Sequence, residues 1–330
     1  IRYRLRSRGL GDVYKRQKII DATDSIVCPT FLNGHTHIGD SIIKDEGYGL
    51  SLGEMVKPPN GVKHKALANA EDGEIIDAMK KSMWDMFESG TTHFIDYREG
   101  GIKGVELLRK ASKNLPVTPV ILGRDDSFYG QNPDLRKVKI AIRKLLKLAD
   151  GIALSGFGEI SDEVASLITS ECRKAGKISS IHVAESMHLQ DDSLRDFNKT
   201  EIQRGVDADF DQLVHCTNPR NNDLELIKNS NVVVCPRANA TLNVGVAPLN
   251  EMFSKGIKPL LGSDNLMLNS PNLFRELEFS LKIMSVYYKN YLNPKDLLKT
   301  ATTNICNFEI NRYIEKPVID VNQELSLIHI

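Results

Sequence analysis

The residues best suited to chemistry are histidines and a carboxylate at the ends of short apolar runs. His35 and His37 close one such run, and because side chains at i and i+2 of a strand share a face, both imidazoles can reach one ion. His182, His215 and Asp264 close three later runs. Four of the eight histidines therefore fall at such ends. Isolated structural histidines would not be expected to cluster in this way, so the pattern favours a metal site.

Short β-branched runs alternate with amphipathic helical patterns along the chain. The predicted strands span 25–37, 92–97, 117–123, 151–156, 178–184, 212–216, 231–236 and 257–262. The predicted helices span 72–90, 104–112, 134–149, 162–175, 193–203, 222–228, 248–255 and 273–288, and a long loop covers 38–71. This order predicts an α/β fold, a closed (β/α)₈ TIM barrel whose site lies at the carboxyl ends of its strands. An open doubly wound sheet is disfavoured, because a glycine-rich phosphate turn does not follow the first strand.

Composition narrows the class of protein further. The 330 residues are 41% hydrophobic and 26% charged, with a formal net charge of zero, which is typical of a soluble globular protein and disfavours nucleic-acid or membrane partners. No apolar run approaches the ~18 residues that a membrane span requires. The five cysteines are odd in number, widely spaced and without a CxxC pair. They predict reduced thiols in a cytoplasmic protein.

The segment Pro29-Thr30-Phe31-Leu32-Asn33-Gly34-His35-Thr36-His37 resembles the opening motif of the amidohydrolase superfamily. The later His182, His215 and Asp264 match its remaining motifs, and the resemblance covers about residues 19–307. It points to the branch that holds cytosine deaminases, adenosylhomocysteine deaminases and chlorohydrolases. The departure is Thr30, where glycine is usual. The resemblance implies that His35, His37, His182 and Asp264 bind one divalent ion, Zn²⁺ or Fe²⁺.

The resemblance also implies catalytic roles. A metal-bound hydroxide would attack the amine-bearing ring carbon, and Glu185, three residues after His182, would shuttle protons. His215 would hydrogen-bond the attacking water or the developing oxyanion, and Asp264 would accept a proton. Binuclear relatives use a carboxylated lysine after strand four. Because residues 151–159 contain no lysine, a single ion is expected.

Polar residues near other strand ends are candidates for substrate binding. The set comprises Arg98, Arg237, Asn239, Asn265 and His64, with Arg124 and Asp125 as further candidates after strand three. Cys-Pro-Arg-Ala-Asn at 235–239 resembles a motif of the same deaminase branch. The predicted function is hydrolytic deamination of a small nitrogen heterocycle such as a pyrimidine or purine. Cyclic-amide hydrolysis, chloride displacement and a non-catalytic binding barrel remain as alternatives.

The two ends of the chain differ from the rest. Residues 12–17 and 325–330 resemble translated sequencing adapters, so we interpret residues 1–17 and 325–330 as non-native segments. Residues 18–26 would then be a remnant of an N-terminal β-sandwich, and 27–324 the barrel. Enzymes of this superfamily usually carry such a sandwich, which would be mostly missing here through truncation. The apolar surface left exposed predicts association, including a homo-oligomer.

Overall fold

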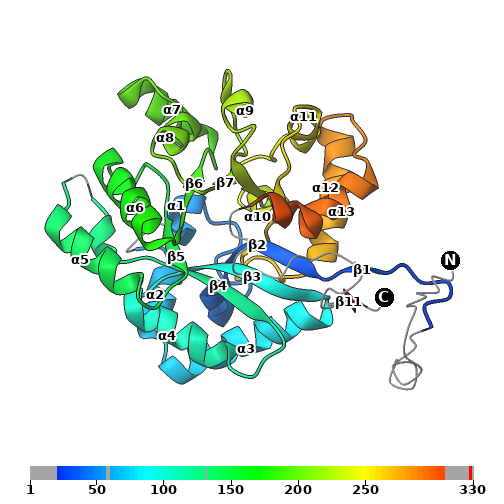
Figure 1. Cartoon of the computed structure of the whole chain (residues 1–330), viewed down its shortest axis with the longest axis horizontal. Coiled ribbons are helices and arrows are strands. Elements are labelled where there is room, and N and C mark those ends of the chain that lie inside the picture. The colour runs from blue at the N-terminus through cyan, green and yellow to red at the C-terminus, as the bar shows by residue number, and fades with distance from the viewer. Residues whose placement is uncertain (1–20, 57–59, 131, 309–326, 329–330) are drawn as a thin grey trace, which may run out of the picture.

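Eight parallel strand positions form the barrel of the computed structural model, which describes residues 21–56, 60–130, 132–308 and 327–328. The strands are β2 (Phe31–His37), β3 (Thr91–Arg98), β4 (Thr118–Gly123), β5 (Gly151–Leu154), β6 (Ile178–Val183), β7 (Gln212–His215), β8 (Asn231–Val234), β9 (Leu260–Leu261) and β10 (Asp264–Asn265). They pair in the order β10-β2-β3-β4-β5-β6-β7-β8-β9. Since β9 and β10 are two parts of the eighth strand, pairing with β8 and β2 respectively, the sheet closes on itself (Figure 1). The predicted TIM barrel is confirmed.

Helices surround this sheet (Figure 1). They are α1 (Leu52–Val56), α2 (Val62–Asn69), α3 (Asp72–Glu88), α4 (Gly101–Ser112), α5 (Leu135–Leu145), α6 (Asp162–Ala175), α7 (Met187–Phe197), α8 (Glu201–Asp207), α9 (Asp223–Leu226), α10 (Pro236–Thr241), α11 (Leu249–Ser254), α12 (Leu273–Tyr287) and α13 (Pro294–Ala301). Among the described residues there are also short 3₁₀ helices: η2 (Ile38–Ile43) after β2, η3 (Asp126–Phe128) before α5 and η4 (Thr303–Asn307) after α13. Within the described residues, no helix combines the length and apolar content needed to cross a bilayer.

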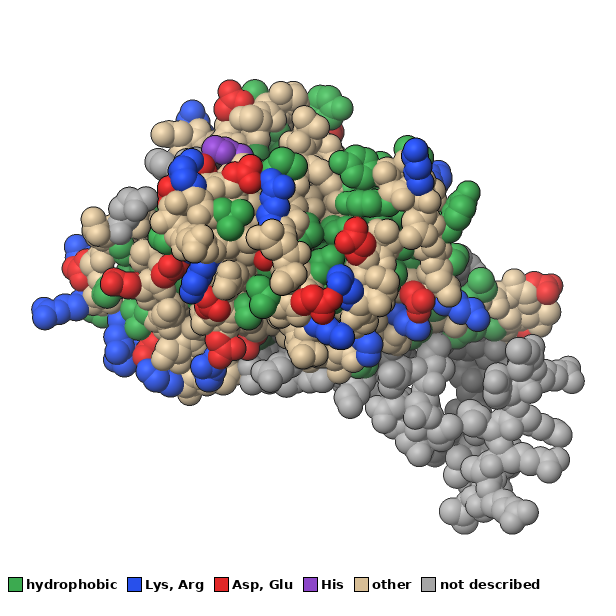
Figure 2. All heavy atoms as spheres, turned by 90° about the horizontal axis from the view of Figure 1, so that it is seen from above, with side chains coloured by type: hydrophobic (Ala, Val, Ile, Leu, Met, Phe, Trp, Pro, Cys, Tyr) green, Lys and Arg blue, Asp and Glu red, His purple; other side chains and the backbone are tan. Residues whose placement is uncertain are grey.

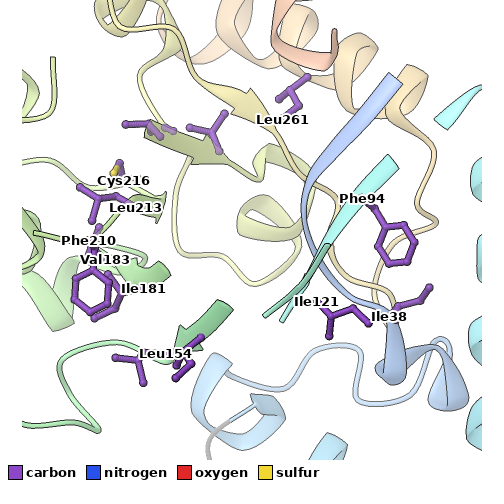
Figure 3. Close-up of a cluster of buried hydrophobic side chains, with 14 of the residues drawn as sticks. Ile38, Phe94, Ile121, Leu154, Ile181, Val183, Phe210, Leu213, Cys216 and Leu261 are labelled. Carbon is purple, nitrogen blue, oxygen red and sulfur yellow. The ribbon is translucent and has the colours of Figure 1, made fainter. Parts of the chain in front are cut away.

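Alternating side chains of the strands build two apolar layers. On β3, Phe94 belongs to a cluster between sheet and helices, whereas its neighbour Ile95 belongs to a second cluster with Val120 of β4 and Val233 of β8. Successive strand residues face opposite sides, so the second cluster fills the barrel interior. Figure 3 shows members of the outer cluster on neighbouring strands, including Phe94. Both faces of the sheet are thus buried, as expected for parallel strands.

Two segments differ from the sequence-based prediction. The expected loop over 38–71 contains η2, α1 and α2. The expected single helix over 193–203 is instead the end of α7 and the start of α8. Asn198 ends α7 in a left-handed conformation with φ 52°, and the Thr200 side chain caps α8 by accepting from the Gln203 amide. Asparagine tolerates this conformation and threonine favours the N-cap, so local capping overrides helix periodicity here.

The ends of the described chain meet outside the barrel. The strand β1 (Cys28–Pro29) pairs antiparallel with β11 (Leu327–Ile328) in a separate two-stranded sheet (Figure 1). The predicted adapter-derived segment 1–17 lies outside the described residues, as does most of 325–330. The proposed domain boundaries therefore stay a prediction. On the face seen in Figure 2, acidic and basic side chains are interspersed, with hydrophobic side chains between them.

Closure of the barrel depends on a glycine between β9 and β10. A Cβ atom at Gly262 would lie 2.7 Å from the Cβ of His35 and 2.9 Å from its backbone nitrogen. Replacement by alanine therefore forces β2 and the eighth strand apart. We expect Gly262→Ala to lower the free energy of unfolding by about 1–3 kcal/mol, as overpacking usually does, measured by urea unfolding and circular dichroism. Gly53→Ala is the matched control, because its Cβ meets nothing within 4 Å. Equal stability of the two variants would contradict this account.

Candidate metal centre and active site

Four histidines converge at the carboxyl ends of β2, β6 and β7. The ring centroid of His35 lies 4.9 Å from that of His37 and 4.9 Å from that of His182. The rings of His182 and His215 stack at 5.2 Å. All four side chains are buried. Histidines as far apart in the chain as His35 and His215 therefore place their imidazoles in one cluster, as the positions of the strand ends predict.

Asp264 completes this cluster from the eighth strand. Its Oδ1 lies 3.1 Å from Nε2 of His35 and 3.6 Å from Nε2 of His37. Burial raises the pKa of Asp264, but the His35 hydrogen bond and the surrounding histidines outweigh burial, so the net pKa is lowered. Asp264 and His215 both have positive φ, 58° and 75°. Such strained backbone is stabilised only by its surroundings and gathers at functional sites.

The hydrogen bonds of two histidines leave their Nε2 atoms free to bind a metal. His182 donates through Nδ1 to the Leu154 carbonyl at 2.7 Å. His37 donates through Nδ1 to Oε1 of Glu99 at 3.0 Å. Burial lowers the pKa of His35, His37 and His182, which keeps the imidazoles neutral, the form that binds metal. The donor set thus fits a divalent ion.

Close grouping of donor atoms supports the same interpretation. The donors of His35, His182 and His215 lie within 4.8 Å of one another, as do those of Glu185, His215 and Asp264. Cys235 joins His35 and Asp264 in a third group, which the sequence did not predict. Burial raises the pKa of its thiol well above the usual value, and a protonated thiol is a poor ligand.

Glu185 faces His215 across the site. Its Oε2 lies 3.7 Å from Nε2 of His215, and burial raises the pKa of its carboxyl group. Asn239 donates through Nδ2 to Nδ1 of His215 at 3.1 Å, and Thr217 donates to the Asn239 Oδ1 at 3.2 Å. These bonds direct an N–H from His215 Nε2 toward Glu185. Asn218 fixes the Glu185 backbone by donating to its carbonyl at 2.8 Å.

A cavity of about 430 Å³ opens above these residues. Its lining includes His37, His182, Glu185, His215, Asp264 and Asn265 at the strand ends, and Leu52, Val56, Leu189 and Leu242 as apolar wall residues. Lys63, Arg124, Glu159 and Asp192 add charges of both signs. A volume of this order and a mainly apolar wall with a few polar groups suit a small organic ligand.

The predicted substrate residues separate into different surroundings. Within the described part of the chain, Asn265 and Arg124 are the candidates that line the cavity, and Asn239 lies behind His215. Arg98 is buried in ion pairs with Glu99 and Asp96, at 2.6 and 3.7 Å. Direct contact of Arg98 with a ligand is therefore not favoured by this arrangement.

The other three candidates make internal contacts. Asp125 accepts from the Ser127 backbone amide at 3.0 Å and caps η3. Arg237 bonds Glu276 through NH1 at 3.2 Å and the Ser270 carbonyl at 3.2 Å. His64 lies on α2, where its Nε2 donates to the Val56 carbonyl at 3.0 Å. Its contact holds α2 against the end of α1, and α1 supplies apolar cavity wall.

A buried charge network behind His37 was missed by the sequence analysis. Glu99 follows β3 and binds Lys63 at 2.8 Å, Arg98 at 2.6 Å and Arg124 at close range. Burial raises the pKa of Glu99, but Arg124, Lys63 and other positive neighbours outweigh it and hold the pKa well below its usual value. The position of Glu99 at a strand end was a usable signal. Lys63 lies in the expected loop, where no pattern marked it.

The comparisons with known proteins agree with this geometry. A model of the amidohydrolase family matches residues 26–309, and the chain belongs to that family. It is therefore a hydrolase that acts on carbon–nitrogen bonds other than peptide bonds. A putative aminohydrolase from Methanothermobacter thermautotrophicus is 46% identical over 299 residues, covering 90% of this chain and 78% of the relative.

Two further proteins are more distant. A 5-methylthioadenosine/S-adenosylhomocysteine deaminase from Thermoanaerobacter pseudethanolicus is 26% identical over 351 residues, covering 94% of this chain and 76% of the relative. The crystal structure of an adenosine deaminase from Xanthomonas campestris with bound zinc superposes with a TM-score of 0.69 at 14% identity, covering 85% of this chain and 66% of the other. Family membership and the donor set together support a divalent metal ion at this centre.

The surroundings of His64 predict a pH dependence of stability. Burial and the nearby Lys63 lower the pKa of His64 from 6.5 to about 4. The unfolded chain takes up this proton near pH 6.5 and the folded chain resists it, so the contribution of His64 is complete above pH 6.5 and is lost as the pH falls toward 4. We expect wild type to lose stability relative to His64→Gln across this interval in urea titrations. Parallel curves for the two proteins would exclude this effect.

Proposed function

We propose that this protein is a metal-dependent hydrolytic deaminase of a small nitrogen heterocycle, a purine, pyrimidine or related ring. The observation that carries the proposal is the position of Glu185. Its Oε2 lies 3.7 Å from Nε2 of His215, and possible ligand atoms of Glu185, His215 and Asp264 lie within 4.8 Å of one another. A proton-carrying carboxyl beside a cluster of metal ligands is what amine departure requires. Relatives named as an aminohydrolase and a deaminase support the same reaction.

The proposed ligands of one divalent ion are His35, His37, His182 and Asp264. Three neutral imidazoles and one carboxylate suit Zn²⁺ first and Fe²⁺ second, and the similar adenosine deaminase holds zinc. When bound, the ion would supply Lewis-acid activation of the attacking water. Residues 151–159 offer no lysine for a second ion.

The protein's own residues would manage the protons. Glu185 would take one proton from the attacking water and deliver it to the ring nitrogen, and the second proton of that water would pass by way of Asp264 to the departing amine, which leaves as ammonia. His215 presents its Nε2–H to the oxygen that adds to the ring, because Asn239 and Thr217 hold its tautomer. Asp264 accepts a proton during water activation. The apolar residues Leu52 and Leu242 form a wall that a flat ring can contact while excluding bulk water.

The proton-shuttle role predicts a large effect of one substitution. Glu185→Gln keeps the size of the side chain but removes its proton transfer, so we expect kcat for deamination to fall by about 10²–10⁴-fold. Ammonia release and products are measured across a panel of aminopurines, aminopyrimidines and their nucleosides, together with cyclic amides and chlorinated rings. Glu106→Gln, on the exposed face of α4, is the matched control and should retain full activity. Ring-opened or dechlorinated product without ammonia would replace deamination with the alternative hydrolyses.

The ligand assignment predicts a metal stoichiometry. We expect purified wild type to hold about one zinc or iron ion per chain by elemental analysis, in line with the occupancy of single-metal catalytic sites. His182→Ala, which removes one of four ligands, should lose most of it. A chelator should abolish activity, and Zn²⁺ should restore it. A folded wild-type protein that holds no such ion after reconstitution would instead support a non-catalytic binding barrel.

A further inference from the structure

A second group of possible metal-ligand atoms lies on the Nδ1 side of His37, away from the other histidines. Donor atoms of His37, Asp40 and Glu99 lie within 4.8 Å of one another. This arrangement is typical of a cation site, yet an ammonium group already lies among them. Lys63 Nζ is 3.1 Å from Oδ2 of Asp40, 2.8 Å from Oε1 of Glu99 and 3.5 Å from Nδ1 of His37. A side-chain cation therefore occupies the position where a second ion would bind.

The surroundings of Lys63 explain why a positive charge is held at this position. Lys63 is 2% exposed and stands in the first turn of α2, where the helix dipole disfavours a cation. A buried ammonium in such a place needs paired anions. Asp40, which is fully buried, and Glu99 supply them. The two carboxylates, rather than the helix, therefore fix the position of Lys63.

One acceptor in the group is still available. Oδ1 of Asp40 is buried and has no hydrogen-bond partner among the described residues. Lys63 uses two of its three N–H donors on Asp40 and Glu99. Carboxylate oxygens are the ligands that hard divalent ions such as Mn²⁺ and Mg²⁺ prefer. The same pocket can therefore coordinate a divalent ion once the ammonium is removed.

We propose that Lys63 is a built-in cation that fills a second cation site behind His37, so that the centre holds one exchangeable metal ion and one tethered ammonium. The proposal rests on the proposed function, because it takes His37 as a ligand of the first ion. Lys63 is then a positioning residue: it neutralises Asp40 and binds the same Oε1 of Glu99 that accepts from the His37 ring. Without Lys63, the two carboxylates bind a divalent ion that prefers oxygen ligands, such as Mn²⁺.

The test counts Mn²⁺ ions on protein already loaded with Zn²⁺. Wild type, Lys63→Met, the double variant Lys63→Met/Asp40→Asn and the surface control Lys199→Met are titrated with Mn²⁺, and free Mn²⁺ is followed by electron paramagnetic resonance. Lys199 pairs with Asp207 at the surface and controls for loss of any lysine. We expect one additional Mn²⁺ per chain for Lys63→Met and none for the other three proteins.

Stability gives a second readout that does not depend on activity. Loss of Lys63 removes the ion-pair partner of the buried Asp40 and one of the three cations around Glu99, so the Tm of Lys63→Met should be low and should rise with Mn²⁺, whereas the Tm of wild type should not change. A Lys63→Met protein that binds no added Mn²⁺, or that stays unfolded in its presence, overturns the proposal. Zinc-loaded wild type that binds an additional Mn²⁺ also overturns it, because the second site would then be open.

These outcomes are distinct from failure of the proposed function. A wild type that holds no zinc removes the first ion and contradicts the deaminase proposal, whatever Lys63→Met does with Mn²⁺. A wild type with one zinc and normal ammonia release, together with a Lys63→Met variant that gains no ion and shows only a raised KM, contradicts the tethered cation alone. In that case Lys63, which also lines the cavity, would be a substrate contact.

Discussion

The carboxylate of Glu99 is the interaction on which the candidate site depends. It accepts a hydrogen bond from His37 and binds Lys63, Arg98 and Arg124. Desolvating an anion costs several kcal/mol unless it is paired, and three buried cations compensate it here. The pairing fixes the orientation and tautomer of His37. It also draws together the end of β3, the end of β4 and the helix α2, so the same ion pairs order the wall of the cavity and the proposed metal ligand His37.

The barrel supplies the second constraint. Parallel strands end at one rim, so donors far apart in the chain are brought within a few ångströms of one another without long side chains. The interruption at Gly262 lets β10 pair with β2 and carries Asp264 to within 3.1 Å of His35. Beyond the rim, the segments that connect strands form the surroundings of the candidate site. The helix α1 contributes apolar wall, and α7 contributes Leu189 and the charged Asp192. The candidate ligands therefore lie at strand ends, whereas α1 and α7, in the connections that follow the strands, form part of the cavity wall.

Much of the fold could be predicted from the sequence, because the information was local. Alternating strand and helix patterns predicted the barrel, and α6 was placed at its observed bounds, 162–175. The break between α7 and α8 was missed, because capping at Asn198 and Thr200 outweighs the helical spacing of apolar residues. Within the site, the spacing of His35 and His37 and the family motif were enough to predict the histidine and aspartate cluster.

Other parts of the site were decided by tertiary structure alone. Arg98 and Arg237 were candidates for ligand contact because of their places near strand ends, and the fold pairs them with Glu99 and Glu276. Nothing in the segment around Lys63 marked it, since its partners lie 23 and 36 residues away along the chain. The sequence by itself determined which strand ends carry imidazoles and carboxylates, because strand periodicity and motif spacing are local. Tertiary structure decided which charges neutralise one another, because burial and long-range pairing set the energy of every buried ion.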